Sequence, residues 1–262
     1  MLENFTYHSD SFDQARSNAF RSWSWEYWMP TLDKSMIYQK IPANVFAGDS
    51  VDYYTNTEDY LVLYWQTSNE DAMKNNLLWF FVDDAKFWST WYKQFQFVQR
   101  LQKISPVACL MPNYSIWGDD PMPEQMYNWY KSLVISRIWQ EMWIKIAPVI
   151  NWWPKESYKF VCEWIPKWLG VVWTQCRNIR IWEEWYFIDW LKFLKEVLQF
   201  QKVVIYWWYE NPALMELCEQ SIEWLEIIPF MSWNSKKRLI EKERTDPVTW
   251  RVHRKPNLQL NF

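Results

Sequence analysis

The chain has 262 residues, a formal net charge of −3 and a hydrophobic content of 50%. This length suffices for one large domain or two small ones with a substantial core, and the small net charge gives no overall attraction to nucleic acid. The four cysteines form no C-x-x-C pair, and the two histidines lie near opposite ends. A zinc site or a disulfide framework is therefore not expected, and we predict four reduced, mostly buried thiols.

The sequence predicts no membrane segment. No run of about 18 apolar residues occurs, as a transmembrane helix would need. The first residues, Met1–Phe5, have neither a basic n-region nor an apolar h-region, so we expect no signal peptide. These features favour a cytoplasmic protein.

Tryptophan and glycine occur in unusual numbers, with 24 Trp and only 3 Gly. Glycine averages about 7% of globular chains, and turns and helix ends use it to reach positive φ. Tryptophan stands where turn glycine is expected, in Asn151–Pro154, Trp164–Trp168 and Tyr206–Trp208, and Trp143 follows a long helical pattern. We interpret many of these tryptophans as glycine in the native protein, encoded by UGA codons that are read as Gly.

The alternative is a genuinely Trp-rich protein, such as a binder of carbohydrate or of a membrane interface. Trp23, Trp25 and Trp28 would then form an aromatic patch. Under the UGA hypothesis some of them are loop glycines and the patch disappears. Aromatic binding surfaces do not explain the loss of glycine, so we prefer the UGA interpretation.

Short apolar runs alternate with helical patterns from about residue 60 onward, which predicts βαβ units and a parallel sheet. We expect one α/β domain with a mainly parallel sheet of about five to seven strands flanked by helices, either doubly wound or a TIM-like or incomplete barrel. The runs lie at 77–82, 107–111, 145–150, 170–173, 202–206 and 224–228; the helical patterns lie before 102 and near 123–142, 155–163, 183–199 and 212–220.

Two flanking segments differ from this domain, which we place at 59–232. Residues 1–58 show few clear periods and are expected to be irregular and to pack on the domain. Residues 233–262 form a basic tail, in which eight Lys and Arg face three acidic residues between Ser235 and Lys255. Such a tail can contact the phosphates of nucleic acid, but we prefer a solvated, mobile tail.

Polar residues follow the expected strands, at the edge where parallel α/β folds bind ligands. Asp83 and Asp84 follow the first run, and Asp119 comes after the second. Carboxylates gathered there could hold Mg²⁺ or Mn²⁺, or serve as an acid–base pair, so we take these three as candidate catalytic residues. The expected substrate-binding residues are Asn113, Tyr114, Ser115, Asn151, Trp152 and Gln175.

A structural interpretation competes at each position, because Asp and Asn at strand ends commonly cap helices or form turns. Asp119–Pro121 is also typical of a helix start. The sequence contains no P-loop and no GxGxxG, GxSxG or HExxH motif. The terminal positions of the two histidines also disfavour Ser-His-Asp and Cys-His mechanisms.

Several stretches resemble DUF4417, a bacterial and phage family of unknown function, over roughly residues 18–230. In the family pattern Trp139 and Trp152 match tryptophan, and aspartate is usual at the position of Asn113, which weakens a catalytic role there. The matching stretches are Phe80–Phe87, Pro112–Ser115 with Asp119 and Pro121, Tyr127–Asn128 with Tyr130, Trp139–Gln140, Asn151–Trp153 and Ile165–Trp168. Glycine is the family residue at Trp143, Trp153, Trp164, Trp168 and Trp190.

The resemblance implies phage or plasmid biology and no particular reaction. Two functions stay open. The first is an enzyme with a carboxylate-containing site at the carboxyl ends of the strands, of the metal-assisted hydrolase type. The alternative is a non-catalytic phage or plasmid accessory protein that binds nucleic acid or a host protein, with the basic tail as its contact.

Overall fold

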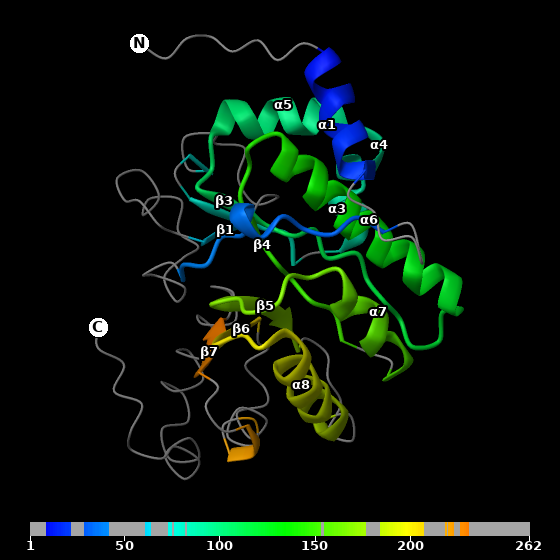
Figure 1. The fold of residues 1–262 in the computed structure, drawn as a ribbon, viewed down its shortest axis with the longest axis vertical. Helices are drawn as coiled ribbons and strands as arrows, with labels where there is room; N and C mark the ends of the chain where they lie inside the picture. Colours follow the sequence, from blue (N-terminus) through cyan, green and yellow to red (C-terminus); the bar gives the residue numbers. More distant parts are fainter. Residues whose placement is uncertain are drawn as a thin grey trace, which may run out of the picture.

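The structure is a computed structural model that describes residues 9–21, 29–41, 61–63, 73–74, 76–81, 83–152, 155–176, 184–206, 218, 220–222 and 226–230. Its described strands are all parallel and form two sheets (Figure 1). One sheet has the order β1 (Leu61–Leu63), β2 (Leu77–Trp79), β3 (Ala108–Leu110), β4 (Ile146–Ala147). The other has the order β5 (Val171–Gln175), β6 (Lys202–Tyr206), β7 (Glu226–Phe230).

The prediction of parallel α/β structure is confirmed, but the prediction of one sheet of five to seven strands is wrong. The strands divide into a four-stranded and a three-stranded sheet, which meet at a single parallel bridge between Val149 and Trp173. The reason lies at the start of β4, where Ile37 forms a parallel bridge with Ile146 and Tyr38 N–H donates to the Ile146 carbonyl at 2.8 Å. The N-terminal segment thus takes the edge that β5 would need, and the described contact with β5 comes after β4, at Pro148 and Val149.

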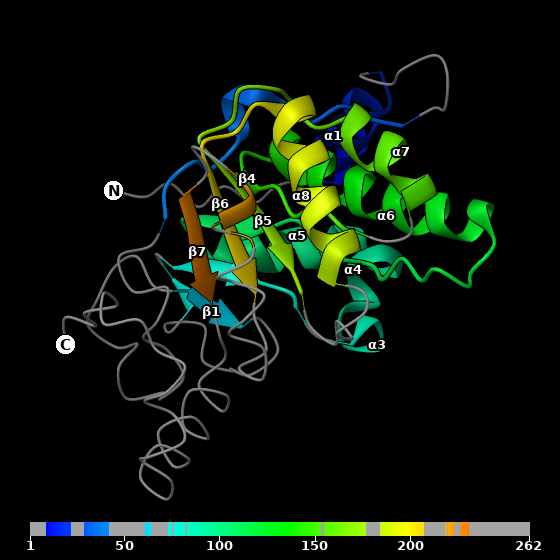
Figure 2. The ribbon, with the colours of Figure 1, turned by 90° about the horizontal axis from the view of Figure 1, so that it is seen from below.

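Helices pack beside both sheets. Figure 1 shows α5 and α6 beside the four-stranded sheet and α8 beside the three-stranded one, and Figure 2 shows α6, α7 and α8 on one side of the strands. The long helices agree with the predicted patterns near 123–142 and 183–199. The described helices are α1 (Ser9–Arg21), α3 (Asp84–Phe87), α4 (Ser89–Tyr92), α5 (Gln94–Ile104), α6 (Met122–Glu141), α7 (Tyr158–Glu163) and α8 (Glu184–Leu198), with short 3₁₀ turns η1 (Lys34–Met36) and η3 (Lys155–Ser157).

The N-terminal segment is more regular than the sequence predicted. Helix α1 lies within residues 1–58 and packs on α6. Phe12, Ala15 and Ala19 are buried, and their spacing places them on one face of the helix. The basic tail at 233–262, the patch Trp23–Trp28 and most of the expected helix at 212–220 lie outside the described residues. Among the helices that the structure describes, none is long and apolar enough to span a bilayer.

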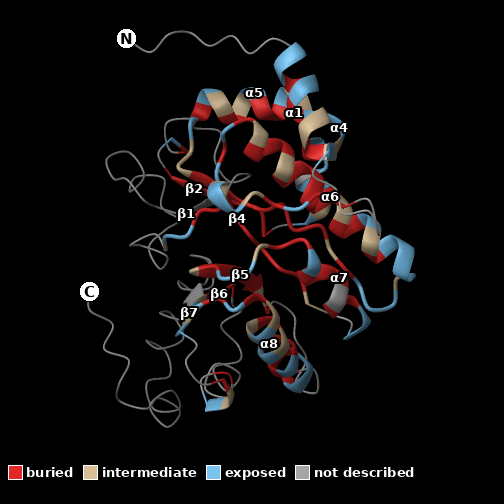
Figure 3. Ribbon diagram, viewed as in Figure 1, coloured by how far each residue is buried: buried red, intermediate tan, exposed pale blue. Residues whose placement is uncertain are grey.

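The core lies between the strands and the helices, and the buried strands and the inner face of α6 appear together in Figure 3. Successive side chains at the end of β2 and just after it point to opposite faces, so they make two separate sets of contacts. Phe80 packs against Trp139 of α6 and Phe97 of α5, whereas Trp79 and Phe81 face the other way and reach Tyr206 of β6, with ring centroids 5.1 and 5.0 Å apart.

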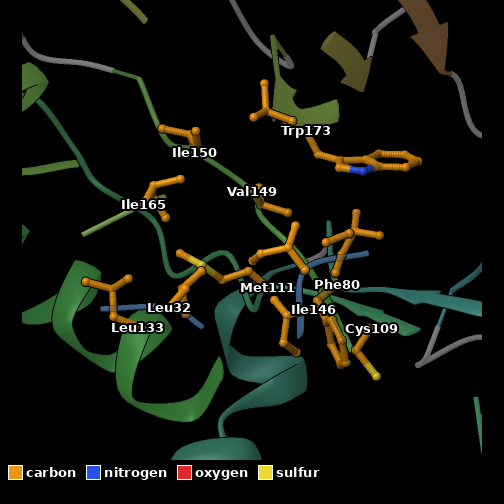
Figure 4. Close-up of a cluster of buried hydrophobic side chains, with 14 of the residues drawn as sticks. Leu32, Phe80, Cys109, Met111, Leu133, Ile146, Val149, Ile150, Ile165 and Trp173 are labelled. Atoms are coloured by element: carbon orange, nitrogen blue, oxygen red, sulfur yellow. The ribbon is translucent and has the colours of Figure 1, made fainter. Parts of the chain in front are cut away.

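Aliphatic side chains continue this core toward the three-stranded sheet. Figure 4 shows Cys109, Met111 and Ile146 in one cluster with Leu133 of α6. All four cysteines are buried as free thiols, as predicted. Burial raises the pKa of Cys109 and Cys162, which keeps both thiols protonated at neutral pH.

Candidate functional site

The three aspartates predicted to be catalytic do not form one cluster. Asp83 is exposed and caps α3, because its Oδ1 accepts a hydrogen bond from Ala85 N–H at 3.0 Å. Asp119 is exposed in the turn before α6. In the part of the chain that the structure describes, no hydrogen bond or ion pair joins either residue to Asp84, and no three His, Cys, Asp or Glu side chains gather as metal ligands. For Asp83 the capping alternative is the one observed.

Asp84 instead binds the loop that follows β3. Its Oδ2 accepts a hydrogen bond from the backbone N–H of Ser115 at 3.0 Å, and its Oδ1 accepts one from the Ser115 hydroxyl at 3.1 Å. Asn128 of α6 donates to the Ser115 carbonyl at 2.7 Å. Ser115 is therefore held from two sides, by the first residue of α3 and by α6.

Tyr114, the neighbour of Ser115, connects three elements. Its hydroxyl shares a hydrogen bond of 2.8 Å with Thr90 Oγ1 of α4. Its carbonyl accepts a hydrogen bond of 2.8 Å from Asn151 Nδ2, in the segment after β4. The residues that follow β2, β3 and β4 thus meet through Asp84, Ser115, Tyr114 and Asn151, and all of them were candidates on sequence grounds.

Lys131, in the middle of α6, is the member of this group that the sequence analysis missed. Its side chain is only 6% exposed, and its Nζ lies 4.5 Å from the ring centroid of Tyr114, 4.9 Å from that of Tyr127 and 5.4 Å from that of Trp88. Aromatic faces attract a cation at such distances. A lysine four residues after a tyrosine on a helix with apolar neighbours was the available signal.

Burial shifts the pKa values of Asp84 and Lys131 in opposite directions. Burial raises the pKa of Asp84, while hydrogen bonds from Ser115 and the charge of Lys131 act against that shift. Burial lowers the pKa of Lys131, while the charges of Asp84 and Glu124 act against it. The pKa values of the two groups are therefore shifted toward each other.

The other predicted substrate-binding residues lie in different surroundings. Asn113 is buried, and its Oδ1 has no hydrogen-bond partner among the residues that the structure describes. A buried acceptor of this kind needs a donor from water or a ligand. Trp152 packs edge-on against Phe187 of α8, with centroids 5.1 Å apart, so it contributes to helix packing. Gln175 ends β5 and is half-buried.

Comparison with known families identifies the chain. The family model described as "Domain of unknown function (DUF4417)" matches residues 49–231. The chain belongs to this family. The match confirms the resemblance seen in the sequence, and DUF4417 supplies no reaction from which to assign the site.

Two phage proteins are related to this DUF4417 chain. The "Gene 1 protein" of Mycobacterium phage D29 is 29% identical over 96 residues, which cover 37% of this chain and 35% of the relative. The "Gene 1 protein" of Mycobacterium phage L5 is 29% identical over 95 residues, which cover 36% of this chain and 41% of the relative. The match therefore spans less than half of each phage protein.

One solved structure is similar over part of the chain, the tryptophan synthase subunit alpha from Campylobacter jejuni. The identity is 13%, the TM-score is 0.32, and the match covers 59% of this chain and 55% of that chain. A similarity at this level carries no argument about fold or function.

Proposed function

We propose that the chain is an enzyme that transfers protons on a small polar substrate, with Lys131 and Asp84 as its acid–base pair. One observation carries the proposal: Lys131, a buried lysine of α6, lies within the electrostatic reach of Asp84, a half-buried carboxylate that follows a parallel strand. Oppositely perturbed titratable groups of this kind are concentrated at catalytic sites. Structural ion pairs also perturb pKa values, so the experiment below measures ligand binding as well as the pKa of Lys131.

We further propose that the two sheets form an incomplete barrel. Three features support it: the strands are parallel, they lie in chain order on both sides of the Val149–Trp173 bridge, and Trp79 and Phe81 reach Tyr206 across the interior. In barrels of parallel strands, reaction sites occupy the carboxyl ends of the strands. Asp84, Asn113 and Asn151 follow strand ends and would share that rim.

Each residue then has a distinct part in the proposed reaction. The neutral Lys131 amine takes a proton from the substrate and becomes an ammonium, while the protonated Asp84 carboxyl gives a proton to the substrate and becomes a carboxylate. Proton transfer from Lys131 to Asp84 then restores both groups. Ser115 fixes the orientation of the Asp84 carboxylate through two hydrogen bonds. Asn113 Oδ1, which has no donor among the described residues, accepts a hydrogen bond from the substrate.

We prefer acid–base chemistry to metal-assisted hydrolysis at this position. Among the described residues no three His, Cys, Asp or Glu side chains gather as metal ligands, and Asp83 is used as a helix cap. The metal-assisted alternative has its own test, which is titration of the chain with Mn²⁺. Binding that Asp84→Asn abolishes would favour that alternative over the acid–base site.

The proposal is tested by NMR titration of a chain labelled with ¹³C-lysine, with the Lys131 signal assigned by its loss in Lys131→Met. We expect its pKa below the ordinary lysine value of about 10.4. A value at or above that number would remove Lys131 as a base. A thermal-shift screen of small carboxylic and carbonyl compounds completes the test, since a substrate should stabilise the unsubstituted chain but not Lys131→Met or Asp84→Asn.

The second candidate function is a nucleic-acid-binding accessory protein, and one surface feature favours it. Trp88 and Tyr92 are 48% and 61% exposed and stack with centroids 4.9 Å apart, with exposed Tyr127 near by. Exposed rings of this kind can stack on the bases of a single strand. Fluorescence anisotropy with a labelled single-stranded oligonucleotide tests it, using Tyr92→Ala and a chain without residues 235–262 to separate the rings from the tail. The absence of binding at low salt would eliminate it.

A further inference from the structure

Four described residues have a left-handed backbone, and none of them is glycine. Their φ angles are 56° at Ser105, 64° at Trp143, 62° at Trp168 and 54° at Gln199, whereas no described glycine has a positive φ. A bulky side chain in this region is a steric outlier, because its Cβ approaches the following carbonyl oxygen. The two tryptophans are therefore the residues least suited to these positions.

Trp143 occupies the C′ position of α6, where glycine is the usual residue. Its N–H donates to the Gln140 carbonyl at 3.0 Å, and the next N–H, of Ile144, donates to the Trp139 carbonyl at 2.9 Å. These two hydrogen bonds make a complete Schellman motif, which needs the left-handed residue at its centre. The indole itself is 78% exposed, so it gains little from burial at this site.

Trp168, in the segment between α7 and β5, also combines a left-handed backbone with an exposed side chain. Its backbone N–H donates to the Leu198 carbonyl at 2.7 Å, which ties the loop to the end of α8, while its indole is 68% exposed. The backbone of the residue is therefore used and its side chain is not. A residue without Cβ meets the same requirement without strain.

Trp139, in the last turn of α6, differs from Trp143 and Trp168 because its side chain is buried. It is 1% exposed, stacks on Phe97 with centroids 5.4 Å apart and an angle of 5° between the rings, and also packs on Phe80. Its large side chain is required by the core. Trp164 and Trp190 are buried and have no positive φ, so backbone conformation does not assign their native residue.

We infer that the native residues at positions 143 and 168 are glycine, and that a glycine tRNA reading UGA is a required partner in the synthesis of this protein. The left-handed φ angles of both residues and the hydrogen bonds of their backbones support this assignment. It also identifies the two exposed indoles as absent from the working protein, so they form no binding surface. The proposed acid–base site does not depend on this assignment.

Peptide mass spectrometry of the protein from the cells that carry its gene tests the inference. Trypsin releases residues 138–145, a peptide that holds both Trp139 and position 143, and residues 168–177, which begin at position 168. We expect both peptides to be lighter by one tryptophan-to-glycine difference, with fragment ions that keep tryptophan at 139. Tryptophan at position 143 or at position 168 would overturn the assignment, and so would UGG codons at both positions.

Substitution in the recombinant chain provides a second, independent measurement. Trp143→Gly and Trp168→Gly should each raise the melting temperature, by about 2–4 °C, because each removes left-handed strain. Trp139→Gly is the matched control and should lower it, since it empties a buried site. A fall in melting temperature for Trp143→Gly and Trp168→Gly would show that the indoles contribute to folding and would contradict the inference.

Discussion

The Asp84 carboxylate accepts both hydrogen bonds that Ser115 can donate, one from its backbone N–H and one from its hydroxyl, across 31 positions of sequence. This pair ties the start of α3 to the loop between β3 and α6. Both oxygens of the carboxylate are thereby oriented, and burial leaves the group dependent on these donors. The stability of the site can be tested one donor at a time.

Ser115→Ala should destabilise the fold by about 1–2 kcal/mol, because it removes one hydrogen bond to a half-buried carboxylate and leaves the backbone donor in place. Urea unfolding at neutral pH measures the change. Ser89→Ala, at an exposed position of α4, is the matched control and should change stability by less than about 0.5 kcal/mol. Equal effects of the two substitutions would show that the Asp84–Ser115 contact contributes nothing specific.

Tyr114→Phe should cost about 1–3 kcal/mol, since it leaves the buried Thr90 hydroxyl without its partner. The double variant Tyr114→Phe with Thr90→Val should recover part of this loss, because no polar group is then left unpaired. A double-mutant cycle from urea unfolding gives the coupling free energy. A coupling near zero would mean that the hydroxyl pair is not formed in solution.

Lys131 should make the free energy of unfolding depend on pH, in a direction that follows from its lowered pKa. Burial lowers the pKa of Lys131 in the folded state, so the folded chain binds fewer protons than the unfolded chain between the lowered value and the ordinary one. The free energy of unfolding contributed by Lys131 should therefore rise as pH increases through this window. Compared at pH 7 and pH 10 by urea unfolding, the unsubstituted chain should gain stability relative to Lys131→Met. A relative loss would show that the pKa is raised.

Gln140 should be the main attachment of the N-terminal segment to α6. Its Oε1 accepts a hydrogen bond from Asp33 N–H at 2.8 Å, and its Nε2 donates to the Asp33 carbonyl at 3.0 Å. Gln140→Leu should destabilise by about 1–3 kcal/mol and increase hydrogen exchange in residues 29–41. Gln99→Leu, at an exposed position of α5, is the control. Unchanged exchange in that segment would contradict the role of Gln140.

Periodicity predicted most of the strands and helices because strands such as β2, β3, β5 and β6 are largely buried apolar runs. Leu77–Trp79 and Lys202–Tyr206 are apolar runs that form strands in the structure, and α6 begins and ends within a residue of the predicted pattern. Helix α1 was missed because its apolar positions are few, with Phe12, Ala15 and Ala19 buried among mostly polar residues. The split into two sheets was missed because it depends on Ile37, a distant residue whose pairing leaves no local pattern.

The candidate site was predictable where it depends on strand ends and not where it depends on helix faces. Asp84, Tyr114, Ser115 and Asn151 follow strands, and the structure joins them by hydrogen bonds. Lys131 contacts them only because α6 packs over the loop after β3, a tertiary relation that sequence spacing does not reveal. Asp83 was grouped with Asp84 because the two are adjacent, but only Asp84 turns toward Ser115. Their catalytic and substrate-binding roles stay predictions.

The pairing of Ile37 with Ile146 has a practical consequence for isolating the family-matched region. That region begins at residue 49 and therefore lacks the segment that covers the starting edge of β4. An uncovered strand edge is a template for intermolecular pairing. A protein trimmed to residues 49–231 should therefore associate through this edge, whereas one that retains residues 29–41 carries its own protection against aggregation.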